Sequence, residues 1–395
     1  MLLYNFLSIT IYLFSKNPTI MKRKSLFLAA LGILLLNSCD KDLVVQDSVP
    51  ATLKLTITGT DVDTRSTVTP LPTQTEENTV QRVTIGLFKS NGGGATDVIK
   101  EFLPGDLTVI NSNTYQTSVQ GSITNDESGA RDVIVVVNAP ANHFAGATTK
   151  TAFITRALTL TQERNSLPMS GVCTATLTAN QIVGPVTAQV SRMVARVDLV
   201  KLSSAFDPAG QYAFASFKAD EVFMFNAMTT SSTDCLNTQL PGHGWLEAPT
   251  PSLYLPILRD AIDQTFTGNT DYTTRHYFYT FANLFTTNLL LPNNLDGPFT
   301  MATRLVISGK FKANASDPGE GERVYYPIII NRLLPPAVPA DPLGIGVKRN
   351  TIYQITAVIK NKGGVTPITI IDPATLGVKV EVLDWEATIP QSAEF

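Results

Sequence analysis

The chain has 395 residues, of which 30 are basic and 33 acidic, and its formal net charge is −3. Charged residues make up only 16% of the sequence, and no basic cluster occurs beyond Lys24, which argues against nucleic-acid binding. The low charge and the abundance of threonine, serine, glycine and proline favour β-sheets joined by many turns, in a chain long enough for two domains.

The N-terminal region has the features of a targeting leader that starts at Met21, MKRKSLFLAALGILLLNSC. A cationic start is followed by an apolar stretch over residues 25–36, which is too short to span a bilayer. The stretch ends in Leu-Asn-Ser-Cys, which resembles the lipobox of bacterial lipoproteins and implies that Cys39 is acylated after signal cleavage. We therefore expect a signal peptide over residues 1–38 and a lipid-anchored chain that does not cross the membrane. An ordinary signal peptide followed by an incidental cysteine is the alternative.

Directly after the leader, residues 51–59 (ATLKLTITG) have the period-two pattern of a half-buried β-strand. One face carries Ala51, Leu53, Leu55, Ile57 and Gly59. The other face carries threonines and a lysine, and a polar segment with a single arginine, Arg65, follows the strand. Exposed polar segments are easily cut, so the segment with Arg65 is a candidate cleavage site. The strand therefore lies between a leader and a candidate cleavage site.

Strand-like runs separated by turn residues recur along the rest of the chain. They cover residues 82–88, 132–140, 188–202, 220–227, 303–311, 324–330, 350–360 and 378–385. In the third run, apolar residues alternate with Arg192, Arg196 and Asp198, which we assign to the opposite face. Convincing amphipathic helices are few. The pattern predicts an all-β fold of sandwiches, with the Gly-Pro-Val sequence at 184–186 as the joint between two domains.

No constellation of side chains predicts catalysis, a metal site or a bound cofactor. The three histidines, His143, His243 and His276, are far apart in the sequence, and none has metal-ligand spacing. The sequence also contains no nucleophile elbow. We therefore expect a protein that is not an enzyme and needs no cofactor. The remaining cysteines, Cys173 and Cys235, either form a disulfide or stay as two free thiols.

Several motifs follow one another in an order that resembles a known family. They are VTIGLF, VVVNAP, LPMSG, VSRMVARVDL and, near the C-terminus, VEVLDW. The most specific is VKRNTIYQITAVIKNKGG at residues 347–364, an Arg-Asn-x-x-Tyr signature followed by a strand. Over residues 39–395 the chain resembles the Bacteroidetes fimbrillins, the FimA/Mfa-type pilins of type V pili.

The resemblance implies a fold and an export route. The fold is two transthyretin-like β-sandwich domains in tandem, which we place at residues 66–185 and 186–395. The export route leads to the cell surface as an outer-membrane lipoprotein, with the lipid on Cys39.

The resemblance also implies trimming after an arginine by an Arg-specific, gingipain-like protease. Arg65 and Ser66 match the cleavage position, so residues 39–65 form a lipidated propeptide that carries the first strand. Arg82 is a weaker candidate for the same role.

Finally, the resemblance implies polymerisation by strand exchange, in which a strand of a neighbouring copy replaces the removed strand. Burying Leu53, Leu55 and Ile57 is worth roughly 5–9 kcal/mol, so removal without replacement is unfavourable. A candidate replacement is the C-terminal tail, EATIPQSAEF, whose apolar face carries Ala387, Ile389, Ala393 and Phe395. A disordered terminus, or a strand that ends its own domain, is the alternative for this tail.

Together these observations predict the precursor of a fimbrial shaft subunit. Its expected partners are copies of itself, related fimbrial subunits, an Arg-specific surface protease, and host or bacterial adhesion targets. An anchor or tip subunit is one alternative. A surface glycan-binding lipoprotein is another, because aromatic residues at 243–247 and 275–285 could present rings to a sugar.

Overall fold

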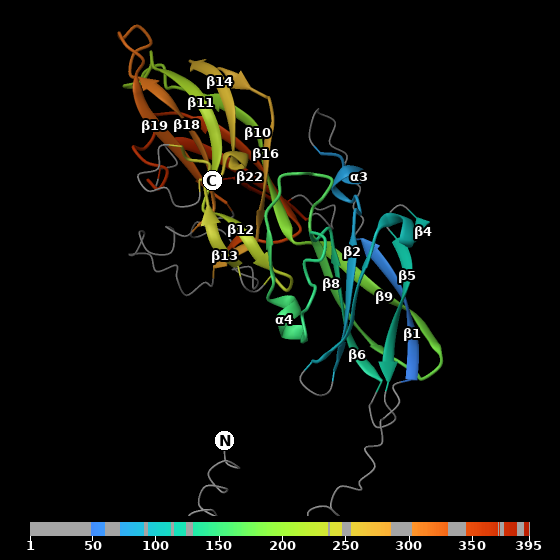
Figure 1. The fold of residues 1–395 in the computed structure, drawn as a ribbon. Helices are drawn as coiled ribbons and strands as arrows, with labels where there is room; N and C mark the ends of the chain where they lie inside the picture. The colour runs from blue at the N-terminus through green and yellow to red at the C-terminus, as the bar shows by residue number, and fades with distance from the viewer. Residues whose placement is uncertain are drawn as a thin grey trace, which may run out of the picture. The chain divides into compact units, whose positions relative to one another are not determined.

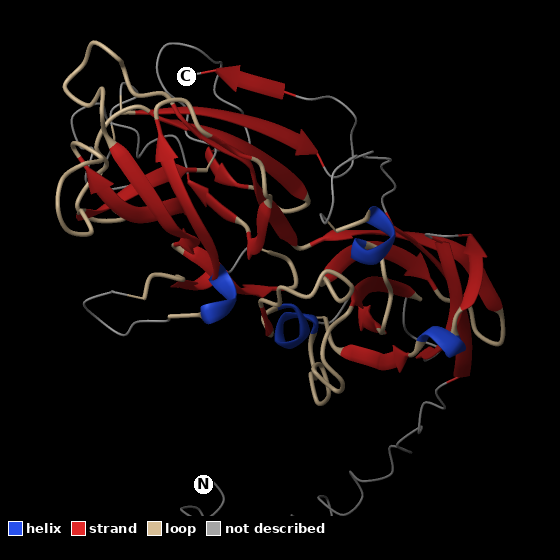
Figure 2. Cartoon of the chain, turned by 90° about the horizontal axis from the view of Figure 1, so that it is seen from above, coloured by secondary structure: helices blue, strands red, loops and turns tan. Residues whose placement is uncertain are grey.

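The computed structural model describes residues 49–59, 72–90, 94–111, 114–123, 129–235, 238–246, 254–285, 302–330, 345–369, 371, 375–384 and 391–394. Strands far outnumber helices in these residues, as Figures 1 and 2 show. The all-β fold predicted from the sequence is confirmed. The leader with Cys39 and the cleavage candidates Arg65 and Ser66 lie outside the described residues. None of the helices in the described ranges is long and apolar enough to span a membrane.

The first sheet contains eight strands. In sheet order they are β3 (Thr96–Phe102), β2 (Val83–Lys89), β6 (Ala130–Val137), β8 (Met169–Thr176), β9 (Ile182–Arg192), β1 (Val49–Gly59), β5 (Thr114–Ile123) and β4 (Thr108–Asn111). The pairing of β8 with β9 is short, joining Met169 to Arg192 and Ser170 to Ser191. The sheet therefore bends at this junction, and its two halves share one core.

This first core is built from alternate residues of strands in both halves. It includes Val83, Ile85 and Leu87 of β2, Val133, Val135 and Val137 of β6, Ala51, Leu53, Leu55 and Ile57 of β1, Val119 of β5, and Ala188 and Val190 of β9. Because side chains of a strand alternate between its faces, the period-two pattern of the sequence places all of these residues on the inner side.

Two further sheets follow in the chain. The first is ordered β13 (Thr238–Gly242), β12 (Ala227–Ser232), β16 (His276–Phe281), β10 (Val194–Ser204), β21 (Thr351–Ile359), β22 (Leu376–Asp384) and β23 (Gln391–Glu394), with β15 (Asp271–Tyr272) on β10 and β7 (Ala157–Thr159) on β12. The second is ordered β14 (Arg259–Thr267), β11 (Ser216–Phe225), β18 (Arg304–Lys312) and β19 (Glu322–Ile329). A small pair joins β17 (Asn283–Phe285) to β20 (Ile345–Val347).

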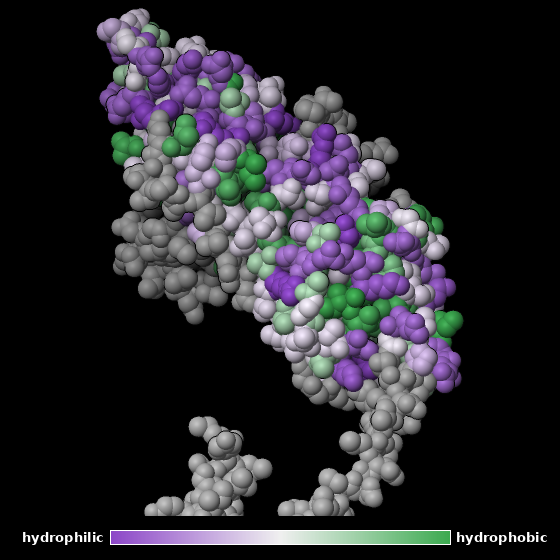
Figure 3. All heavy atoms as spheres, in the orientation of Figure 1, coloured by the Kyte–Doolittle hydropathy of each residue, from purple (hydrophilic) through white to green (hydrophobic). Residues whose placement is uncertain are grey.

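The second core runs without a break from these sheets to the outer face of β2 and β6. The link is α4 (Lys150–Ile154), whose Phe153 stacks on Phe144 with ring centroids 3.9 Å apart and meets Phe88 of β2 edge-on. The other short helices are α3 (Gln74–Glu77) and the 3-10 turns η1 (Pro104–Asp106) and η2 (Pro256–Leu258). Hydrophilic residues cover much of the face drawn in Figure 3, and apolar residues form smaller patches between them.

The Gly-Pro-Val sequence expected at a domain joint lies instead inside β9. Gly184 has φ of +113°, and the register between β1 and β9 shifts between Leu53 and Leu55. A Cβ on Gly184 would lie 2.4 Å from the Lys54 carbonyl oxygen, so glycine permits a bulge here rather than a turn. The chain passes from one sheet to the next at Met193, which divides the single run expected over 188–202 into two strands.

Replacing Leu53 by alanine in the full-length chain should lower the free energy of unfolding of the first core by about 2–5 kcal/mol, because it leaves a cavity at a fully buried position. Thr52→Ala, one position away on the outward face, should cost less than about 1 kcal/mol. Urea denaturation followed by circular dichroism measures both. Equal losses for the two variants would contradict the burial of this strand.

Candidate strand-exchange site

The first strand, β1, is paired along both of its edges. On one side, every residue from Val49 to Thr58 opposes a residue of β5 in an antiparallel ladder. On the other side, β1 pairs in parallel with β9, from Thr52 opposite Ile182 to Gly59 opposite Val190. Figure 1 shows β1 beside these strands.

Much of β9 depends on β1 for its pairing. Among the described residues, β9 pairs with a strand other than β1 only at Ser191 and Arg192, which face β8. Removing β1 would therefore leave one edge of β5 and most of β9 with unpaired backbone groups. Open edges of this kind accept an added strand. We call the space that β1 fills between β5 and β9 the slot.

The side chains of β1 explain why the slot cannot stay empty at low cost. Ala51, Leu53, Leu55 and Ile57 are each no more than 1% exposed. Burying the three larger ones contributes roughly 5–9 kcal/mol. The outward residues of β1 are half-buried, and Gln116 of β5 donates a hydrogen bond to the Thr56 hydroxyl at 3.3 Å. The slot thus selects its occupant mainly by alternate apolar side chains.

The C-terminal tail makes a different contact in this single chain. Gln391–Glu394 form β23, which pairs antiparallel with β22 at the edge of its own sheet, from Val382 opposite Gln391 to Lys379 opposite Glu394. The candidate donor residues Ala387, Ile389 and Phe395 lie outside the described residues, and Ala393 is described only as part of the strand. The pairing corresponds to the alternative in which the tail ends its own domain, so a donor role requires β23 to leave β22.

The Arg-Asn-x-x-Tyr signature ties the first sheet to the second. Arg349 donates hydrogen bonds to the carbonyl oxygens of Ser170, Ser191 and Arg192 at 3.0–3.3 Å. The next residue, Asn350, has φ of +53° and donates its backbone N–H to the Val194 carbonyl at 2.8 Å. The signature therefore fixes the junction of β8, β9 and β10, a role that the sequence pattern alone did not reveal.

A buried charge cluster lies where α3 meets β10 and β16. The Glu77 Oε1 atom accepts hydrogen bonds from Arg196 Nη1 at 2.7 Å and from the Tyr279 hydroxyl at 2.6 Å. Arg196 also binds both carboxylate oxygens of Asp198, at 2.9 and 3.2 Å. Burial raises the pKa of the Glu77 carboxyl, and the neighbouring Arg196 guanidinium opposes that rise. The face to which Arg196 and Asp198 were assigned from the sequence is thus buried where it meets α3.

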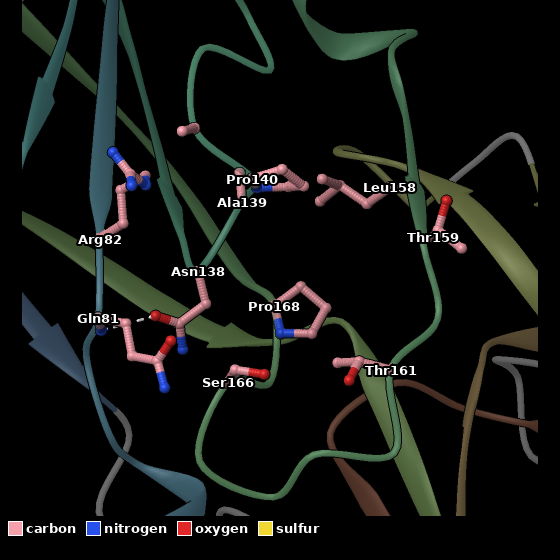
Figure 4. A pocket seen from close by; sticks show the side chains of 11 residues that line it. Gln81, Arg82, Asn138, Ala139, Pro140, Leu158, Thr159, Thr161, Ser166 and Pro168 are labelled. Carbon is pink, nitrogen blue, oxygen red and sulfur yellow. Dashed lines mark hydrogen bonds between the residues drawn. The ribbon is translucent and has the colours of Figure 1, made fainter. Parts of the chain in front are cut away.

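A pocket of about 350 Å³ lies beside the start of β2 (Figure 4). Several of its polar groups are bound within the protein. The Asn138 side chain accepts a hydrogen bond from the Gln81 backbone N–H at 2.8 Å and donates to the carbonyls of Thr79 and Leu167 at 2.8 and 3.0 Å. Arg82 pairs with Glu101 at 3.0 Å. These contacts hold the chain in place at the start of β2.

The histidines serve packing. His276 stacks on Tyr272, and its Nδ1 lies 3.2 Å from an Asp260 carboxylate oxygen. His243 stacks on Phe225. His143 packs edge-on against Phe144, and burial lowers its pKa. No group of three metal-ligating side chains occurs in the part of the chain that the structure describes.

The aromatic and cysteine residues noted in the sequence are also placed in the structure. Tyr279 and Phe281 are fully buried, so these rings of the segment 275–285 belong to the core rather than to a sugar-binding surface. Cys173 and Cys235 are both free thiols.

Comparisons with known proteins agree with the fold. Residues 51–199 match the family model described as Major fimbrial subunit protein (FimA). Among solved structures, the chain is similar to a candidate cell adhesion protein from Parabacteroides distasonis, with 20% identity and a TM-score of 0.59, covering 86% of this chain and 100% of that one. It is also similar to a fimbrilin (FimA) from Porphyromonas gingivalis, with 18% identity and a TM-score of 0.56, covering 84% of this chain and 97% of that one. None of the curated proteins matches the chain.

The resemblance to the Bacteroidetes fimbrillins is therefore confirmed. The family model covers the first sheet and extends into β10, and the structural likeness extends the fimbrilin fold over most of the chain. This family is one of structural fimbrial subunits and not of enzymes. Residues 51–199 thus carry the likeness to the family model, and the solved structures show the fold that the chain shares with them.

Replacing Arg349 by methionine should lower the free energy of unfolding by about 2–4 kcal/mol, because three carbonyl groups lose a charged donor. Arg323→Met is a matched control, since Arg323 pairs with Asp220 near the surface and should contribute less than about 1 kcal/mol. Chemical denaturation measures the difference. Similar losses in the two variants would remove the special role assigned to the signature arginine.

Proposed function

We propose that the chain is the precursor of a fimbrial shaft subunit, exported as a lipoprotein, trimmed after Arg65 and polymerised by strand exchange. The observation that carries this proposal is the position of β1. It is an early strand, following the candidate lipid site Cys39 and preceding the candidate cleavage site Arg65 in the sequence. Yet it is paired on both edges and buried in the first core.

In this proposal, β1 protects the slot until the precursor reaches the surface. The lipid on Cys39 holds the precursor in the outer membrane, and cleavage between Arg65 and Ser66 by an Arg-specific protease detaches residues 39–65. The released segment can then leave, and the mature subunit begins at Ser66. The empty slot exposes apolar side chains and unpaired edges, which favours binding of a new strand.

The C-terminal tail is the proposed new strand. Its alternate face, Ala387, Ile389, Gln391, Ala393 and Phe395, has the same five positions as the inward face of β1, with Gln391 as the one polar interruption. In the single chain, β23 pairs over four residues at a sheet edge, so detaching it breaks fewer contacts than the slot offers. We further propose two sandwich domains. The sequence predicts them at residues 66–185 and 186–395, and we propose that the boundary lies at Met193, between β9 and β10.

The processing step predicts a defined mature terminus. Protein recovered from assembled fimbriae should begin at Ser66, and Arg65→Ala should leave the full lipidated precursor and no polymer. N-terminal sequencing and intact mass measure the terminus, and heat-resistant ladders on denaturing gels report assembly. Arg259→Ala, a change at a distant arginine, serves as the control. Polymers that retain an acylated Cys39 would overturn the shaft assignment.

Loss of the donor strand should abolish polymerisation without abolishing trimming. Deleting residues 388–395 should leave a folded monomer that is still trimmed but does not polymerise, because the slot is intact while the new strand is missing. Size-exclusion chromatography of the trimmed protein distinguishes monomer from polymer. Normal fibre formation by this truncated chain would show that another segment is the donor.

A further inference from the structure

Two arginines, Arg65 and Arg82, lie between the end of β1 and the start of β2. An Arg-specific protease could recognise either from the sequence alone. A cut after Arg82 would place the new terminus at Val83, the first residue of β2, and would detach α3 together with β1. Correct trimming therefore needs a structural feature that lets the protease cut after Arg65 and not after Arg82.

The backbone at Arg82 is held by Asn138. The Gln81 N–H donates to Asn138 Oδ1 at 2.8 Å, and the Asn138 N–H donates to the Arg82 carbonyl at 2.9 Å. The Asn138 amide also donates to the Thr79 carbonyl at 2.8 Å, and Figure 4 shows Asn138 beside Gln81. A protease must draw the chain around the cut bond out of such contacts, so cleavage here requires local opening.

The Arg82 side chain is restrained as well. Its Nη1 lies 3.0 Å from Glu101 Oε2, and only 26% of the side chain is exposed. Glu101 also accepts a hydrogen bond from the Asn142 backbone N–H at 2.8 Å, which fixes the carboxylate in place. The guanidinium that an Arg-specific protease must bind is therefore already engaged within the protein.

Five residues before Arg82, Glu77 anchors the same segment to the second sheet. Its carboxylate is bound by Arg196 and Tyr279, and the residue is 2% exposed. Opening the chain around Arg82 would pull on this anchor. Withdrawing Glu77 would leave Arg196 with Asp198 as its carboxylate partner, and removing one member of a buried charge group is strongly unfavourable.

We infer that Glu77 and Asn138 hold the segment around Arg82 in place. They thereby withhold the Arg82–Val83 bond from the Arg-specific protease and confine trimming to Arg65. The same anchor retains α3 on the mature subunit after β1 has left. This inference rests on the proposed function, because it names what restricts the proposed cleavage to one arginine.

The test uses the Arg65→Ala background, in which Arg82 is the remaining arginine between β1 and β2. The three full-length proteins are R65A, R65A/E77Q and R65A/E76Q. Glu76 is the matched control: it neighbours Glu77 in α3, but its carboxylate is 36% exposed and pairs with Arg164 at 3.2 Å. Each protein is treated with a purified arginine-specific endoprotease, and the products are identified by N-terminal sequencing and intact mass.

R65A and R65A/E76Q should resist cleavage after Arg82. R65A/E77Q should yield a product beginning at Val83 at least about tenfold faster, because the rate of cutting follows the population of the locally opened state. Hydrogen exchange should quicken at residues 75–82 of R65A/E77Q while β21 stays protected. Equal resistance of the E77Q and E76Q proteins would overturn the inference.

E77Q could unfold the whole chain, and cuts after the buried Arg131 and Arg304 as rapid as the cut after Arg82 would show this. A second variant covers that case. R65A/N138G leaves the charge cluster intact, and glycine accepts the φ of +60° at this position. It should also expose Arg82 selectively, and resistance equal to R65A would overturn the inference.

Failure of this inference and failure of the proposed function can be told apart. A native subunit that keeps its acylated Cys39 would defeat the proposed trimming, while the digestion series would still decide whether Arg82 is withheld. A native terminus at Val83 would overturn the inference while leaving trimming itself in place.

Discussion

The pairing of β1 with β5 on one edge and with β9 on the other is the interaction on which the rest of the molecule depends. The inward side chains of β1 fill the first core, so this strand supplies both the hydrogen bonds of two neighbours and part of the apolar interior. Losing a strand in that position without a substitute is costly, because apolar side chains and two strand edges become exposed. The same property makes it a suitable place for a neighbouring subunit to join the fold.

Other contacts hold the fold around the slot. Arg349 binds the carbonyls of Ser170 and Ser191, which lie where β8 meets β9. Because these bonds lie beyond the part of β9 that faces β1, they can keep β9 attached at one end when β1 is absent. Glu77 performs a similar task for α3 through Arg196 and Tyr279. The contacts that are lost when β1 is removed and the contacts that remain thus involve different residues.

The sequence predicted those features that depend on local pattern. The alternation around Leu53 and Leu55 indicated a half-buried strand because one face of β1 meets a core. It did not reveal that both edges of β1 are paired, because the partners lie more than fifty residues away in β5 and β9. Gly184 and Pro185 suggested a joint between two domains, but they lie at a bulge inside β9. The pattern assigned Arg196 and Asp198 to one face of their strand, but it did not reveal that this face is buried, because the partner Glu77 comes from a distant helix. The local alternation of residues therefore predicts the fold class, whereas the site depends on pairing between strands that are far apart in the sequence.

Amide hydrogen exchange along β9 and β5 tests the central claim most directly. The amides of Ile182–Val190 that pair with β1 should be protected in the precursor, should exchange rapidly in the trimmed monomer from which residues 39–65 have been removed, and should be protected again in the polymer. Protection that persists in the trimmed, unassembled monomer after the β1 peptide has been separated from it would show that no slot opens, and would contradict the account.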